Sequence, residues 1–119
     1  MDDCPFCAII AGREPATIDR AWPDAVAIRP RRGGVNDSHV LVIPNTHVAD
    51  AGENPAVTAA VMARAAELIA ERPSANLITS KGKPATQSVP HLHVHVITRT
   101  AGDGLSLPWT SQQAKENNP

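Results

Sequence analysis

A long apolar run is missing from this chain of 119 residues. No stretch approaches the roughly 20 apolar residues that a membrane-spanning helix requires. The acidic start, Met1-Asp2-Asp3, also lacks the basic and apolar regions of a secretory signal peptide. We therefore expect a cytoplasmic protein with no membrane partner.

Neither sign of charge is in excess. Eleven lysines and arginines oppose twelve aspartates and glutamates, for a net charge of −1. This balance creates no broad field that would attract a polynucleotide, so we expect no nucleic-acid polymer as a partner. One short basic cluster, formed by Arg29, Arg31 and Arg32, is explained by a solvated loop at least as well as by a phosphate contact.

Aromatic residues and cysteines are scarce. The chain has one phenylalanine and no tyrosine, so its capacity for stacking on a nucleobase is small. Its two cysteines, Cys4 and Cys7, are three positions apart, and in a cytoplasmic protein this spacing indicates a metal or redox pair rather than a structural disulfide. A glutaredoxin-like dithiol is disfavoured, because that motif follows a strand and only three residues precede Cys4.

Histidines, by contrast, are concentrated in one stretch. His91, His93 and His95 occur at intervals of two, and because side chains alternate along a strand, all three would line one face of it. The other face would carry the core residues Leu92, Val94 and Val96. β-Branched residues favour a strand over 90–98. A core histidine with a satisfied hydrogen bond would have to occur three times in five positions, so the pattern indicates an active site.

The remaining pattern predicts one α+β domain over residues 1–119. A chain of this length, 42% hydrophobic, suffices for a single modest core. We expect a short helix at 8–11, paired strands at 16–22 and 25–29, a loop at 30–37, a buried central strand at 40–43, a long helix at 55–72, and strands at 76–79 and 90–98. The helices would pack on a mostly antiparallel sheet, with frayed tails at 1–3 and 111–119.

The cysteine pair supplies half of a possible zinc site. Tetrahedral zinc needs two further nitrogen or sulfur ligands, which the distant His47 and one histidine of the 91–95 stretch could supply. The spacing alone leaves these two ligands open, and two reduced, partly buried thiols are the alternative. A catalytic zinc bound by all three histidines of that stretch is disfavoured, because same-face residues of a straight strand lie almost in a line.

The run His91-Leu92-His93-Val94-His95-Val96-Ile97 resembles the His-φ-His-φ-His-φ-φ signature of the histidine triad (HIT) family. The preceding Gln87-Ser88-Val89 and the N-terminal C-x-x-C are similar to the zinc-bearing, nucleotide-binding branch, and the resemblance covers about residues 4 to 98. It implies a five-stranded, mostly antiparallel sheet with one long and one short helix, extended across a homodimer. It also implies a closed, structural zinc bound by Cys4, Cys7, His47 and His91.

The resemblance implies a hydrolase as well. His93 would attack the α-phosphorus of a nucleoside phosphoramidate or related nucleotide, and water would cleave the resulting nucleotidyl-histidine. A backbone carbonyl or buried polar group would hold the other ring nitrogen of His93. His95 would donate to the phosphate, and Ser88 would protonate the leaving group. The expected phosphate contacts are Ser80, Thr86 and Gln87, and the expected base contacts are Phe6, Ile9 and Ile28.

The chain departs from the family at positions that contact the sugar and the phosphate of the nucleotide. Ala27 stands where relatives carry a ribose-binding aspartate, and Asp37 is the expected substitute. Ser80 and Thr86 replace an asparagine and a glycine near the phosphate. Two alternatives stay open: hydrolysis of dinucleoside polyphosphates, and a nucleotide-binding or zinc-organised interaction protein without catalysis.

Overall fold

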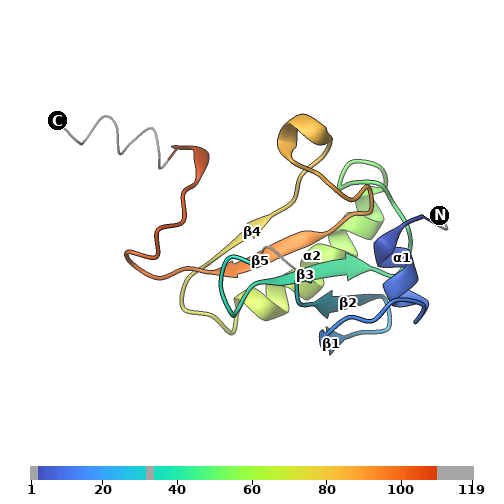
Figure 1. Cartoon of the computed structure of the whole chain (residues 1–119), viewed down its shortest axis with the longest axis horizontal. Coiled ribbons are helices and arrows are strands. Elements are labelled where there is room, and N and C mark those ends of the chain that lie inside the picture. The colour runs from blue at the N-terminus through green and yellow to red at the C-terminus, as the bar shows by residue number, and fades with distance from the viewer. Residues whose placement is uncertain (1–2, 32–33, 110–119) are drawn as a thin grey trace.

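The computed structural model describes residues 3–31 and 34–109. In this part of the chain five strands form one antiparallel sheet in the order β1-β2-β3-β5-β4, and one long and one short α-helix cover opposite faces of it (Figure 1). The predicted α+β fold is confirmed. None of the described helices is long and apolar enough to cross a membrane. The predicted frayed tails lie outside the described residues, except for Asp3, which is an exposed turn residue.

The strands align the site residues across the sheet. Their bounds are β1 Ile18–Ala21, β2 Ala25–Ile28, β3 Val40–Pro44, β4 Ala75–Ile78 and β5 Val94–Thr98. β1 and β2 form the predicted hairpin, and β3 is central with all of its residues buried, as predicted. Ile28 pairs with Leu41, and Leu41 pairs with His95. One face of the sheet thus carries a row of side chains that leads from β2 to a histidine of the triad.

The long helix α2, Pro55–Ile69, builds the main core on the other face. Asn54 caps it as predicted, since its side chain accepts hydrogen bonds from the first-turn N–H groups of Ala56 and Val57. The helix ends three residues before the predicted bound of 72, because the chain continues as hydrogen-bonded turns. Its buried residues pack against the predicted core face of the histidine stretch, namely Leu92, Val94 and Val96.

The short helix α1, Pro5–Ile10, begins before the predicted bound of 8. Cys4 is its N-cap, and the Cys4 Sγ accepts a hydrogen bond from the N–H of Cys7 at 3.3 Å. Proline at the first helical position suits this start. The C-x-x-C motif therefore forms the first turn of a helix, and Phe6 packs with Ile28 and Leu41 on the face opposite α2.

The predicted strand over 90–98 is too long at its N-terminal end. β5 begins at Val94, so His91 and His93 precede the strand and only His95 lies within it. The pairing with β3 stops at Val42 opposite Val94. Beyond that point the N–H of Leu92 donates to the carbonyl of Val48, a loop residue, at 2.8 Å. The alternation of core and site side chains nevertheless continues through both histidines.

Candidate active site and metal centre

Four side chains from three parts of the chain meet at the N-terminus of α1. Cys4 and Cys7 come from the cap and first turn of the helix, His47 from the loop after β3, and His91 from the segment before β5. Nδ1 of His91 lies 3.3 Å from Sγ of Cys4, 3.5 Å from Sγ of Cys7 and 3.1 Å from Nδ1 of His47. All four donor atoms lie within 4.8 Å of one another.

These donors fit a tetrahedral metal ion. Zinc bonds of about 2.0 Å to nitrogen and 2.3 Å to sulfur place neighbouring ligand atoms about 3.3 to 3.8 Å apart, close to the separations in this cluster. Nε2 of His91 lies 3.0 Å from the carbonyl of Pro44, which can only accept, so the proton is on Nε2 and the Nδ1 lone pair faces the cluster. Burial lowers the pKa of His91, which keeps the ring neutral and able to bind metal.

The predicted ligand set of Cys4, Cys7, His47 and His91 is thus confirmed as a metal site. With four protein ligands such a site is closed, so its metal contributes stability and activates no water. The rings of His93 and His95 take no part in this cluster.

His93 is held in a single tautomer. Its Nδ1 lies 2.8 Å from the main-chain carbonyl of His91, which can only accept, so Nδ1 carries the proton and Nε2 carries the lone pair. The expected backbone acceptor behind this ring is therefore present. Nε2 makes no hydrogen bond to any described residue, and 9% of His93 remains exposed. The hydroxyl of Thr79 donates to the carbonyl of His93 at 2.8 Å and fixes the backbone at the same point.

His95 is oriented by His39. The N–H of Val35 donates to Nδ1 of His39, so the proton of His39 is on Nε2, which lies 2.9 Å from Nδ1 of His95. Nδ1 of His95 accepts this bond, which leaves the proton of His95 on Nε2. Burial, together with the rings of His93 and His39, lowers the pKa of His95 to about 4. At neutral pH His95 is thus an uncharged donor.

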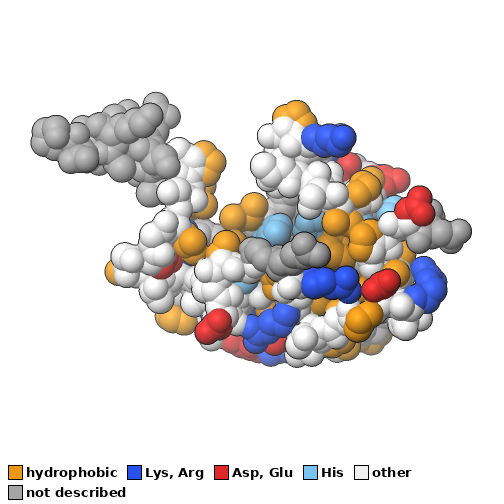
Figure 2. Space-filling view, viewed as in Figure 1, with side chains coloured by type: hydrophobic (Ala, Val, Ile, Leu, Met, Phe, Trp, Pro, Cys, Tyr) orange, Lys and Arg blue, Asp and Glu red, His pale blue; other side chains and the backbone are white. Residues whose placement is uncertain are grey.

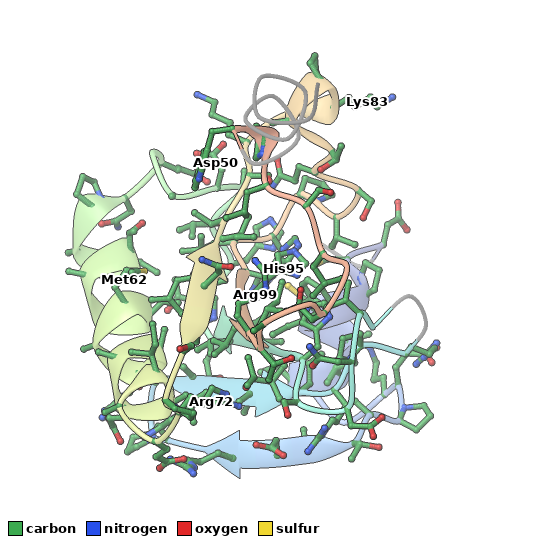
Figure 3. The ribbon with its side chains drawn as sticks, turned by 90° about the vertical axis from the view of Figure 1, so that its left-hand side faces the viewer. Asp50, Met62, Arg72, Lys83, His95 and Arg99 are labelled. Atoms are coloured by element: carbon green, nitrogen blue, oxygen red, sulfur yellow. The ribbon has the colours of Figure 1, made fainter. Side chains whose placement is uncertain are left out.

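The donor and the nucleophilic nitrogen belong to neighbouring rings. The ring centroids of His93 and His95 are 5.1 Å apart, and Phe6 packs edge-on against His93 at the same distance. His95 lies near the middle of the molecule, away from Met62 of α2 (Figure 3). Histidine atoms reach the surface beside hydrophobic side chains near the middle of one face (Figure 2). A ring lone pair on His93 thus lies beside an N–H donor on His95, as attack on a phosphate requires.

A cavity of about 810 Å³ opens beside α1. Its apolar lining contains the three predicted base contacts, Phe6, Ile9 and Ile28, and its polar rim contains Glu14, Arg29 and Arg31. Because Phe6 also touches His93, the cavity adjoins the histidine cluster. The volume lies in the range of small-molecule sites.

The predicted sugar contact is not in this cavity. Ala27 is fully buried in the core on the α2 side, so a longer side chain there would point away from the cavity. Asp37 is exposed and does not line the cavity, although its carbonyl accepts a hydrogen bond from Arg29.

The predicted phosphate residues lie in the segment between β4 and β5. Gln87 clamps this segment, since its Oε1 accepts from the N–H of Gly82 at 2.9 Å and its Nε2 donates to the carbonyl of Ala49 at 2.7 Å. Thr86 adopts a left-handed conformation with φ of 68°. Ser88 is exposed and Ser80 is half-buried, and neither side chain bonds to a described residue. Their roles stay predictions.

Sequence reasoning missed the role of His39. The residue was visible as a histidine at the start of the central strand, but it lies 56 positions from His95. Only the register of β3 against β5, with Leu41 opposite His95, indicates that they meet.

The fold and the site together define a histidine triad protein with a Cys2His2 metal centre. The chain belongs to the HIT domain family, whose model matches residues 22–102. It is similar to an uncharacterised HIT-like protein of Mycobacterium tuberculosis, with 35% identity over 114 residues that cover 87% of this chain and 76% of that protein. It also matches the adenylylsulfatase HINT3 of Arabidopsis thaliana, with 28% identity over 99% of this chain and 61% of that protein.

Solved structures agree with this assignment. A zinc-bound histidine triad family protein from Mycobacterium smegmatis superposes with a TM-score of 0.77 at 34% identity, covering 89% of this chain and 81% of that one. A HIT family hydrolase from Clostridium thermocellum superposes with a TM-score of 0.76 at 27% identity, covering 90% of this chain and 98% of that one. The zinc in the mycobacterial relative supports the metal site found here.

Proposed function

We propose that this protein cleaves a nucleoside phosphoramidate or a related nucleotide at the α-phosphate, as a hydrolase or nucleotidyl transferase. The observation that carries the proposal is the tautomer of His93. Its Nδ1–H is bound to the carbonyl of His91 at 2.8 Å, so the lone pair of Nε2 is free to attack phosphorus. A core histidine would direct both ring nitrogens to partners within the protein.

The reaction has two steps. Nε2 of His93 forms a bond to the α-phosphorus while the bond from phosphorus to the leaving group breaks. The leaving group takes a proton, for which the exposed Ser88 is the proposed donor. Water then attacks the same phosphorus and returns a proton to Ser88, the bond to His93 breaks, and the nucleoside monophosphate departs.

Two neighbours stabilise the charges that develop. The carbonyl of His91 keeps the Nδ1–H of His93 in place while the ring becomes positive. The Nε2–H of His95 donates to a phosphate oxygen, and because the pKa of His95 is about 4, this donor is present across the neutral range. Neither role requires water activated by the metal.

The nucleoside would occupy the cavity beside α1. Its apolar lining suits a base, and Phe6 is the one aromatic ring among the described residues that line it. The Arabidopsis relative is named for action on an adenylyl compound, which makes adenine the first base to test.

The test is release of AMP from adenosine 5′-phosphoramidate. Wild type should show turnover and, after rapid acid quenching, an AMP adduct in the mass of the protein. His93→Ala should abolish both signals, while the exposed variant Glu71→Gln should keep them. Equal background rates in wild type and His93→Ala would remove the enzymatic proposal.

The same assay separates the alternatives. Faster turnover of diadenosine polyphosphates than of the phosphoramidate would favour a dinucleoside polyphosphate hydrolase. AMP binding without turnover of any substrate would favour a nucleotide-binding or interaction protein.

We also propose a homodimer that extends the sheet across one of its edge strands, β1 or β4, because each carries an exposed isoleucine, Ile18 or Ile78. Light scattering at micromolar concentration tests this, and a monomeric mass would contradict it.

We propose the cytoplasm as the location of the protein. A metal site with two thiol ligands fits this reducing compartment.

A further inference from the structure

Two arginines of the short basic cluster, Arg29 and Arg31, line the cavity, and both side chains are also exposed to solvent. Arg29 and Arg31 border the same space as Phe6 and Ile28. Arg29 directly follows Ile28, which is aligned through Leu41 with His95, two strand spacings or about 10 Å away. Arg29 would therefore border the part of a nucleotide bound in this cavity that lies between the base and the α-phosphate.

Both guanidinium groups make hydrogen bonds within the protein but keep further N–H donors. Nη2 of Arg29 donates to Asp19 at 3.1 Å, and Nη2 of Arg31 donates to the carbonyl of Pro15 at 2.9 Å. Nε of both residues and Nη1 of Arg31 make no hydrogen bond to a described residue. Each group therefore presents several donors in a geometry that matches a phosphate.

The carboxylate beside Arg31 holds this arginine only weakly. Glu14 lies 3.5 Å from Nη2 of Arg31, and the two side chains are 51% and 60% exposed. Exposed pairs of this kind contribute little and exchange readily with a stronger anion. A phosphate group, with up to two charges and several acceptor oxygens, would displace Glu14 from Arg31.

We infer that Arg29 and Arg31 bind a second phosphate on the ribose, so that the preferred substrates are nucleotides phosphorylated at the 2′ or 3′ position. Nucleotide sites elsewhere make the same distinction, since a carboxylate binds ribose hydroxyl groups whereas an arginine accommodates a ribose phosphate. Here Asp37 lies outside the cavity and Ala27 is in the core, while two arginines stand at the rim. The volume of about 810 Å³ leaves room for the additional group. This inference rests on the proposed function, because it assumes that the cavity takes the nucleoside.

Calorimetric titration of the metal-loaded protein with four ligands tests it. AMP supplies the reference, ADP adds a phosphate at the leaving-group position, and adenosine 2′,5′- and 3′,5′-bisphosphate add one to the ribose. We expect at least one bisphosphate to bind about tenfold more tightly than AMP, with a smaller gain for ADP. The stronger of the two bisphosphates identifies the ribose position.

Arginine variants test the assignment to residues. Arg29→Gln and Arg31→Gln should each reduce the ratio of bisphosphate to AMP affinity toward one. Arg20→Gln, which removes the same charge from a residue paired with Glu71 outside the cavity, should leave the ratio unchanged. If a variant does not fold, the wild-type ligand series still decides.

The outcomes are distinguishable from failure of the proposed function. If AMP and the bisphosphates all fail to bind, the nucleotide site itself is wrong. If AMP binds but neither bisphosphate binds more tightly, or if ADP gains as much as they do, the ribose-phosphate inference alone is overturned. An unchanged ratio in both arginine variants would also overturn it.

Discussion

The main-chain carbonyl of His91 accepts the Nδ1–H of His93 at 2.8 Å, while the ring of His91 directs its own Nδ1 into the metal cluster. The main chain of His91 therefore sets the tautomer of His93, the proposed nucleophile, while its ring belongs to the set of side chains that can bind a metal. A metal bound by these four side chains would hold the segment that orients the ring of His93.

Metal removal should lower both stability and turnover. We expect about one zinc per chain and a lower melting temperature after chelation, because four ligands lose their common partner. Turnover should fall as well, because the His91 carbonyl is no longer held in place. Elemental analysis and thermal unfolding measure the first two effects. Wild-type protein with less than about a tenth of an equivalent of zinc would contradict the assignment.

Replacement of His39 should impair the reaction without any direct contact to the phosphate. His39→Ala removes the donor at 2.9 Å from Nδ1 of His95, which allows the proton of His95 to move to Nδ1. Loss of one such hydrogen bond corresponds to a decrease of about tenfold in kcat. His39→Gln places an amide N–H near the position of Nε2 and should restore part of kcat. Equal rates for the two variants would argue against a tautomer effect.

The acid titration of His95 should be displaced far below that of a free histidine. Its pKa of about 4 in the folded protein lies below the unfolded value of about 6.5, so the unfolded chain binds more protons between these two values. The contribution of His95 to stability is therefore complete above pH 6.5 and is lost as the pH falls toward 4. NMR titration of the ring should place its midpoint near 4, whereas a midpoint near 6.5 would contradict the burial described here.

The ion pair of Arg99 and Asp103 should stabilise the segment after β5. Asp103 bonds both Nε and Nη2 of Arg99 at 2.8 and 3.0 Å, and it also accepts from the N–H groups of Thr100 and Leu105. Asp103→Asn should lower the free energy of unfolding by about 1 to 3 kcal/mol, because several charge-assisted hydrogen bonds are weakened together.

A matched pair on the surface provides the control. Asp24 pairs with Arg64 at 2.9 Å but is 44% exposed, against 15% for Asp103. Asp24→Asn should change the free energy of unfolding by less than about 1 kcal/mol. Urea unfolding measures both variants, and an effect at Asp24 as large as that at Asp103 would contradict the role of burial.

Local patterns in the sequence predicted those helices and strands that form because of neighbouring residues, such as an apolar run or a helix cap. The apolar run at 40–43 indicated the central strand, and Asn54 with Pro55 indicated the start of α2. Alternation along 91–96 separated the core residues from the histidines, even though the first part of that stretch is not in a strand. The C-x-x-C spacing indicated a metal or redox pair, and the structure places both cysteines in the cap and first turn of α1.

Tertiary structure decided what depends on register and on loop paths. The pairing of β3 with β5 brings His39 to His95 across 56 positions, and no local pattern contains that distance. β3 ends at Pro44, so the segment before β5 is not paired with it. In this segment the ring of His91 points into the metal cluster, while the ring of His93 lies beside the cavity. Packing likewise decided which residues border that cavity. Ala27 lies on the core face of β2. Arg29 and Arg31, which the sequence also explains as part of a solvated loop, line the cavity. Spacing sets which side chains share a face, but only the folded chain sets which faces meet.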